Sequence, residues 1–309
     1  MKKPLIADLS LLFVTIIWGS TFVLVQNAID FLEPFSFNSI RFLAAAILLI
    51  LCLFVFEKEQ FKKLDTKLLL SGVFIGFWLF LGYATQTIGL LYTTSSKAGF
   101  ITGLNVVLVP FFSMMLLKQF PTRNAVFGVL IATIGLFLLT MTDVTALNKG
   151  DGFVFICAIS FALQIIYTGK FSNKYPTLLL TIIQISTVAI LSILSSFLFE
   201  DWRKSFNPEI LLTKDVIIAL VITSIFATAL AFLIQTNFQR YTSATRVALI
   251  FTMEPVFAAI TGFYWANERL SYSALIGCLL IFAGMIFAEL PTKKIPFLKR
   301  SKGMEDKVL

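Results

Sequence analysis

Long, continuous apolar runs recur along the whole of this 309-residue chain, and they constrain its fold more than any other feature. A helix of about 20 apolar residues, rising 1.5 Å per residue, crosses the hydrocarbon core of a bilayer. The composition agrees, because 58% of the residues are hydrophobic, 14% are charged and the mean hydropathy is +0.90. A soluble domain needs a larger share of polar residues for its surface. We therefore predict an all-α membrane protein.

Ten runs are long enough to be transmembrane helices, and the gaps between them are too short to fold as separate soluble domains. The first run carries polar residues such as Thr15 and Ser20 at its centre, unlike a cleaved signal peptide. The expected spans are residues 5–25, 35–56, 68–88, 97–117, 124–141, 152–169, 177–199, 215–238, 246–265 and 272–289.

The distribution of basic residues predicts how these spans are oriented. If the N-terminus is cytoplasmic, 18 of the 25 lysine and arginine residues fall in cytoplasmic segments and 6 fall outside, with Arg41 inside the second span. Cytoplasmic loops carry the excess of basic residues in membrane proteins. The pattern therefore predicts that both termini are cytoplasmic. It also assigns the net charge of +8 to membrane topology and not to nucleic-acid binding.

The chain contains an internal repeat. Shifts of 149 and 143 positions align the pairs Gln86 with Gln235, Lys97 with Arg246, Trp18 with Phe161 and Arg41 with Gln184. Each copy has five spans, an odd number, so the second copy must enter the membrane upside down. Inverted repeats are typical of alternating-access carriers, whose substrate site lies near the midplane between the halves. We predict one five-helix repeat at 1–145, a second at 146–290, and a basic cytoplasmic tail at 291–309.

Several short motifs also occur in the order found in a known family. They are Trp18-Gly19-Ser20, Arg41-Phe42, the stretch from Thr93 to Leu104, Glu254-Pro255, Glu268-Arg269-Leu270-Ser271, and the glycines Gly277 and Gly284. On these motifs the chain resembles the EamA branch of the drug/metabolite transporter superfamily, although Gln119 stands where that family often has an acidic residue. The resemblance implies a ten-helix carrier with a cavity lined mainly by spans 1, 3, 4, 6, 8 and 9. It also implies export of amino acids, metabolites or drugs across a bacterial cytoplasmic membrane.

Polar and aromatic side chains within the apolar spans are the candidate substrate-binding residues, because polar groups in hydrocarbon normally face the interior of a helix bundle. They are Trp18, Tyr83, Gln86, Asn105, Gln164, Gln235 and Glu254. Together they predict an aromatic, largely neutral pocket whose amides both donate and accept hydrogen bonds. The alternative is that the amides tie neighbouring helices together.

Glu254 carries the sharpest expectation, because a carboxylate about two turns into a span needs either a partner or a proton. It could bind a substrate amine, carry a coupling proton, or form an ion pair with Arg41 or Arg246. The structural alternative is a fixed ion pair that only holds helices together.

Three basic residues are candidates for gating or for charge pairs. Lys97 and Arg246 are expected at the outer and inner mouths of the cavity, where they could form ion pairs with the opposing half or snorkel to the interface. Arg41 could form an ion pair or cap backbone carbonyls near a helix end. Pro110 and Pro255 each remove a backbone hydrogen bond and are candidate hinges, although proline is also tolerated in membrane helices.

Small residues recur at a spacing of four in two spans. Gly128 with Ala132, and Gly284 with Ala288, form small faces of the kind used in helix packing or in the seam of a homodimer.

The composition argues against an enzyme. The chain has no histidine, which removes the commonest general base and metal ligand. Its three cysteines all lie in apolar runs, so we expect them to pack, with no metal site and no cofactor. The expected partners are a small-molecule substrate and the lipid bilayer. An ion channel, which needs a ring of carbonyls or charges, and a non-transporting membrane protein are the alternative functions.

Overall fold

The computed structural model describes residues 2–290 except for 30, 94, 141–147, 202, 204–206 and 266–269. The motif residues Glu268 and Arg269 and the tail 291–309 therefore lie outside the described residues. In the first half the helices are α1 (Lys2–Ile29), α2 (Pro34–Phe56), η1 (Lys58–Lys63), α3 (Thr66–Leu90), α4 (Ser95–Gly103), α5 (Asn105–Leu117) and α6 (Arg123–Thr140). In the second half they are α7 (Lys149–Ser172), α8 (Thr177–Phe199), α10 (Pro208–Leu211), α11 (Lys214–Ile222), η2 (Thr223–Leu230), α12 (Ala231–Gln239), α13 (Ala244–Phe251), α14 (Glu254–Trp265) and α15 (Tyr272–Glu289).

The described residues form an all-α membrane protein, as predicted. Nine helical segments are long and apolar enough to cross a bilayer, and Tyr272–Ala288 in α15 is a further, shorter apolar helix. Large apolar side chains cover the outer faces of these helices, where a soluble protein would carry polar groups. Such faces are stable in contact with lipid.

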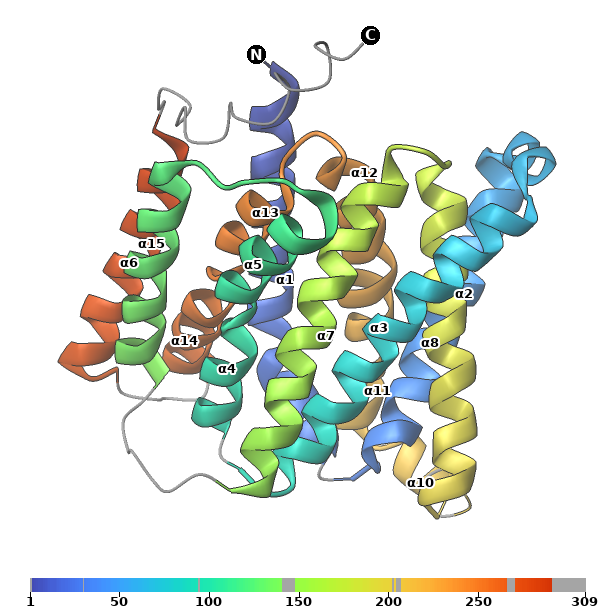
Figure 1. Ribbon diagram of the computed structural model, residues 1–309. Coiled ribbons are helices and arrows are strands. Elements are labelled where there is room, and N and C mark those ends of the chain that lie inside the picture. Colours follow the sequence, from blue (N-terminus) through green and yellow to red (C-terminus); the bar gives the residue numbers. More distant parts are fainter. Residues whose placement is uncertain are drawn as a thin grey trace, which may run out of the picture.

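The two halves interlock in opposite orientations (Figure 1). The contact between α6 and α15 shows this most clearly, because the two helices run antiparallel and pack closely against each other. A Cβ atom added to Gly128 would lie 2.6 Å from the carbonyl oxygen of Gly284, and one added to Gly277 would lie 2.5 Å from that of Gly135. The shift of 149 maps Gly128 onto Gly277 and Gly135 onto Gly284, so the contact repeats itself about a two-fold axis.

This contact decides between the two roles expected for the small-residue faces. Gly128 and Gly284 face each other, and the alanines Ala132 and Ala288 lie in the same contact. The faces therefore pack within one chain, and the expectation that they form the seam of a homodimer is wrong. A homodimer formed through other surfaces stays a prediction.

Two of the predicted continuous spans are broken in the middle. Residues 97–117 form α4 and α5, which are separated at Leu104, and residues 246–265 form α13 and α14, which are separated at Thr252 and Met253. The shift of 149 maps Asn105, the first residue of α5, onto Glu254, the first residue of α14. Broken helices in membrane proteins are tolerated where they line a cavity or are buried in protein.

The prolines lie differently with respect to these breaks. Pro255 is the second residue of α14, where its missing N–H group leaves no intrahelical bond unmade. Pro110 lies inside α5, beyond the break. The hinge role of both residues stays a prediction.

The start of α2 is fixed by the end of α8. The Glu200 carboxylate accepts hydrogen bonds from the backbone N–H groups of Phe35 (2.6 Å) and Ser36 (2.8 Å). A carboxylate at a helix N-terminus satisfies unpaired donors and interacts favourably with the helix dipole. Because α2 carries Arg41, this cap also fixes the depth of that residue in the bundle.

The α6–α15 contact predicts a difference between two glycine substitutions. Gly135→Ala places a Cβ atom 2.7 Å from the Gly277 carbonyl oxygen, which forces the helices apart. We expect this overpacking to destabilise the protein by about 1–3 kcal/mol. The matched control is Gly152→Ala in α7, where no atom lies within 4 Å of the new Cβ. Size-exclusion profiles recorded after heating in detergent measure the difference, and equal midpoints for both variants would contradict the role of the contact.

Candidate functional site: a central cavity between the two halves

A cavity of about 340 Å³ lies between the two halves of the bundle. It is lined by helices from both halves, which include α1, α2, α3, α7, α12 and the broken helices. All seven candidate binding residues line it: Trp18, Tyr83, Gln86, Asn105, Gln164, Gln235 and Glu254. Arg41 lines it as well. The structure thus brings the predicted set together, and its role in binding stays a prediction.

The cavity extends toward one end of the bundle. Its lining includes Val25 and Ile29 in the last turns of α1, and Leu90 and Leu91 at the end of α3. Both helix ends lie opposite the N-terminus of α1 (Figure 1). On the N-terminal side, buried apolar residues from α1, α5, α7, α12 and α13 pack into one cluster, which we call the seal. Its members include Leu11, Val14, Val109, Ala162, Ile166, Ala231, Val247 and Ala248.

The aromatic wall of the cavity is centred on Trp18. Its ring packs against Phe232 and Phe251, with centroid distances of 5.4 and 5.1 Å. Its indole Nε1 donates a hydrogen bond of 2.8 Å to the carbonyl oxygen of Ala227. Ala227 lies in η2, a π-helical stretch inside the eighth span. Such stretches are frequent at functional sites, because they alter the regular backbone bonding and side-chain register.

The Arg41 side chain is buried beside the same stretch. Its Nε donates to Thr228 Oγ1 at 2.7 Å and its Nη2 donates to the Ala227 oxygen at 3.4 Å. The guanidinium also lies 5.4 Å from the ring centroid of Tyr83. The predicted carbonyl contact is therefore present. It lies within the bundle, beside the cavity, and not at a helix end as expected.

Glu254 and Asn105 occupy equivalent places at the two helix breaks. Each is the first residue of its half-helix and lines the cavity. The Glu254 carboxylate makes no hydrogen bond or ion pair with the part of the chain that the structure describes. A Cβ atom on Gly19 would lie 2.6 Å from the Glu254 carbonyl oxygen, so α1 crosses α14 at this level. This crossing brings the Trp18 and Glu254 stretches together.

The glutamines of the cavity wall also connect helices. Gln235 Nε2 donates to Gln164 Oε1 at 3.2 Å and to Gln239 Oε1 at 3.3 Å, and Gln164 donates to Thr168. Gln86 Nε2 lies 3.4 Å from Thr102 Oγ1. These amides therefore link α7 to α12 and α3 to α4, and they also line the cavity, so their expected role in tying helices together is confirmed, while their role in binding stays a prediction.

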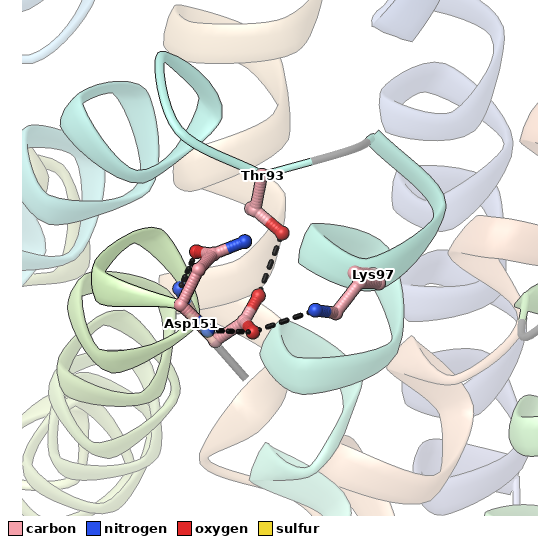
Figure 2. Close-up of polar contacts among 4 residues, drawn as sticks. Thr93, Lys97 and Asp151 are labelled. Carbon is pink, nitrogen blue, oxygen red and sulfur yellow. Dashed lines mark hydrogen bonds and ion pairs between the residues drawn. The ribbon is translucent and has the colours of Figure 1, made fainter. Parts of the chain in front are cut away.

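Lys97 and Arg246 both form ion pairs with the opposite half. Lys97 Nζ lies 2.7 Å from Asp151 Oδ2, and both side chains are only 5% exposed (Figure 2). Asp151 also accepts a hydrogen bond from Thr93 Oγ1 at 2.6 Å. Arg246 Nη2 lies 2.6 Å from Asp8 Oδ2. The expectation that Lys97 snorkels is therefore wrong, and so is the pairing of Arg246 with Glu254.

Several residues of the site were missed at the level of sequence. Asn38 lines the cavity one turn before Arg41, and an asparagine within an apolar span was a signal for it. Phe161 also lines it, and its repeat partner Trp18 was a second signal. Phe251 carries no such signal. The acidic partners Asp8 and Asp151 are themselves related by the shift of 143. In the described residues no group of three or more acidic or cysteine side chains is arranged to hold a metal ion.

Comparison with known proteins identifies the family. The profile of the EamA-like transporter family matches residues 5–141 and, a second time, residues 148–289. The chain belongs to the EamA-like transporter family. The resemblance drawn from the motifs is therefore confirmed, and this EamA protein is a multi-pass membrane transporter.

Relatives extend over nearly the whole chain. An uncharacterized transporter of Archaeoglobus fulgidus is 35% identical over 93% of this chain and 87% of its own length. The uncharacterized transporter YyaM of Bacillus subtilis is 26% identical over 93% of this chain and 94% of its own. A solved crystal structure shares the fold of this EamA protein, with a TM-score of 0.78 at 20% identity over 92% of this chain and 96% of that one.

The buried ion pair predicts a large effect of a single substitution. Lys97→Met leaves the buried Asp151 carboxylate without its cation, and we expect a loss of about 3–5 kcal/mol of stability. Adding Asp151→Asn should recover most of it. The control is Lys62→Met, whose pair with Glu59 is 78% and 71% exposed and should change stability by less than about 1 kcal/mol. Thermal unfolding in detergent measures the stability of all three variants. Equal unfolding midpoints for Lys97→Met and Lys62→Met would contradict the prediction.

Proposed function

We propose that this protein is a secondary transporter that exports small zwitterionic metabolites, such as amino acids, by alternating access. The observation that carries the proposal is one cavity lined by both inverted halves, extending to one end of the bundle and sealed at the other. A carrier needs such a cavity, because its substrate site must open to the two sides in turn.

The packing differs between the two ends of the bundle, and this difference supports alternating access. At the sealed end α5 packs against α13. The repeat relates this pair to α14 and α4, which lack comparable packing in the described residues. Exchanging the two contacts would close the present opening and open the other end. A channel would instead need a passage through the seal, so the packed cluster favours a carrier.

The charges and the size of the cavity support a small zwitterion. Arg41 and Glu254 both line it, one a basic and one an acidic residue, between aromatic walls that include Trp18 and Phe232. In this proposal the guanidinium binds a substrate carboxylate and the Glu254 carboxylate binds an ammonium group. The volume of about 340 Å³ lies at the small end of ligand pockets.

Counterflow in proteoliposomes tests the substrate class. The probes are radiolabelled phenylalanine, phenethylamine, which lacks the carboxylate, and 3-phenylpropionate, which lacks the amine. We expect saturable exchange of phenylalanine alone. Glu254→Gln should lower it roughly tenfold to a hundredfold, because a hydrogen bond to a charged group is lost. The matched control is Glu209→Gln, at an exposed position in α10 away from the cavity.

Three results would count against this proposal. Normal exchange by stably inserted Glu254→Gln protein would remove Glu254 from the mechanism. Equal exchange of all three probes would contradict the proposal that the substrate is a zwitterion. A conductance that does not saturate with substrate concentration would favour a channel instead.

Membrane orientation is the further part of the proposal. We place both termini in the cytoplasm of a cell on the basic residues, so that the cavity extends outward. Fusions after residue 309 test this: green fluorescent protein should fluoresce there, and alkaline phosphatase should be inactive. An active phosphatase fusion would reverse the assigned sides.

A further inference from the structure

The two ion pairs at the ends of the bundle are copies of one another. The shift of 149 maps Lys97 onto Arg246, and the shift of 143 maps Asp8 onto Asp151. The cation of each copy pairs with the acid of the other copy, at 2.7 Å for Lys97 with Asp151 and 2.6 Å for Arg246 with Asp8. Each pair therefore ties α4 or α13 of one half to the first helix of the other half.

The pairs lie at opposite ends of the bundle. Lys97 lies near the start of α4, just beyond the end of α3, where Leu90 and Leu91 line the cavity. Asp8 lies near the start of α1, at the end closed by the seal. Figure 1 shows the starts of α4 and α13 at opposite edges of the bundle.

The structure thus shows one copy of the ion pair at the closed end of the cavity and the other copy at the open end. Beside Arg246 the passage is closed, because α13 packs on α5. Beside Lys97, within the described residues, the equivalent α4 has no comparable packing against α14. Both ion pairs are nevertheless formed. By the inverted symmetry, each pair would keep its partner when the open and closed ends exchange.

We infer that these two ion pairs are permanent fasteners between the halves, and not gates that break in each cycle. Lys97–Asp151 makes α4 move with α7, and Arg246–Asp8 makes α13 move with α1. The inference rests on the proposed carrier function. Of the two roles expected for Lys97 and Arg246, it favours the charge pair over the gate.

The surroundings of the pairs fit a contact that persists. Asp151 is held on three sides, by Lys97, by the Thr93 hydroxyl and by the backbone N–H of Asn148 at 2.9 Å (Figure 2). The last bond belongs to the capping box that starts α7. A carboxylate built into a helix cap is a poor candidate for repeated release, because its donors would lose their partner as well.

The packing of the helices assigns the same moving bodies. The first helix α1 crosses α14 at Gly19, so α1 contacts both parts of the broken ninth span. The repeat-equivalent α7 likewise packs against α4 and α5. The bodies that move would therefore combine helices of both sequence halves: α1 with α13 and α14 in one, and α7 with α4 and α5 in the other.

Reversible cross-linking tests this inference. In a background with Cys52, Cys157 and Cys278 replaced by alanine, Lys97→Cys with Asp151→Cys is joined by a flexible, reducible bifunctional thiol reagent. The transport probe is phenylalanine counterflow. We expect the joined protein to stay within about twofold of the same protein after reduction, because the fastened helices move together.

The matched control joins the two sides of the seal. This control carries Val109→Cys in α5 and Val247→Cys in α13. Joining the two cysteines should lower the rate of counterflow roughly tenfold or more, and reduction should restore it. Asp8→Cys with Arg246→Cys repeats the test at the pair whose arginine is 35% exposed, should the Lys97→Cys and Asp151→Cys protein fail to fold.

The outcomes separate the two ideas. If a cross-link between positions 97 and 151, or between positions 8 and 246, blocked counterflow reversibly, the inference that the ion pairs are permanent would be overturned. The proposed carrier function would still stand. A parent protein that exchanges no phenylalanine would overturn the proposed function, and the fasteners with it.

Discussion

Inside a bilayer no water is present to satisfy a free backbone N–H or carbonyl group, and the rest of this structure depends on that constraint. It explains why almost every span is a continuous helix. It also gives meaning to the two exceptions, at Leu104 and at Thr252–Met253, since an interrupted helix can persist only where other polar groups or a cavity meet it. Both interruptions border the central cavity through Asn105 and Glu254. Among the described residues, both interrupted spans therefore border one site.

The cost of an unsatisfied polar group in the bilayer also explains where the charged side chains lie. Glu254 and Arg41 lie in the cavity, and the other buried charges of the described residues are paired, as Lys97 is with Asp151. The pairs form between the halves and not within them. Small residues behave alike, since Gly128 and Gly135 contact their repeat partners' helix across the two-fold axis. The two repeats therefore form one interlocked body, whose halves would leave cavity walls and charges exposed if separated.

Much of the fold and part of the site could be predicted from the sequence. Run lengths located the spans, because the hydrocarbon core fixes a helix length, and polar residues such as Gln164 and Gln235 indicated the inner faces. The helix breaks were missed because Gly103-Leu104-Asn105 lies inside an otherwise continuous apolar run, where Asn105 indicated a binding residue and not a helix end, while the proline that was noticed, Pro110, lies inside α5. The partners of Lys97 and Arg246 were missed because pairing depends on which half lies against which. That arrangement is a property of tertiary packing, and no local pattern encodes it.

The π-helical stretch Thr223–Leu230 has a consequence for the chain that follows it. A π-turn contains one residue more than an α-turn, and each residue of an α-helix advances by about 100° around the axis. The extra residue therefore sets the rotational phase of α12, which carries Phe232 and Gln235 on the cavity wall. Shortening this stretch by one residue would keep the span apolar and long enough for the bilayer, yet would turn both side chains toward another neighbour. Chain length here, as much as residue identity, determines what the cavity presents.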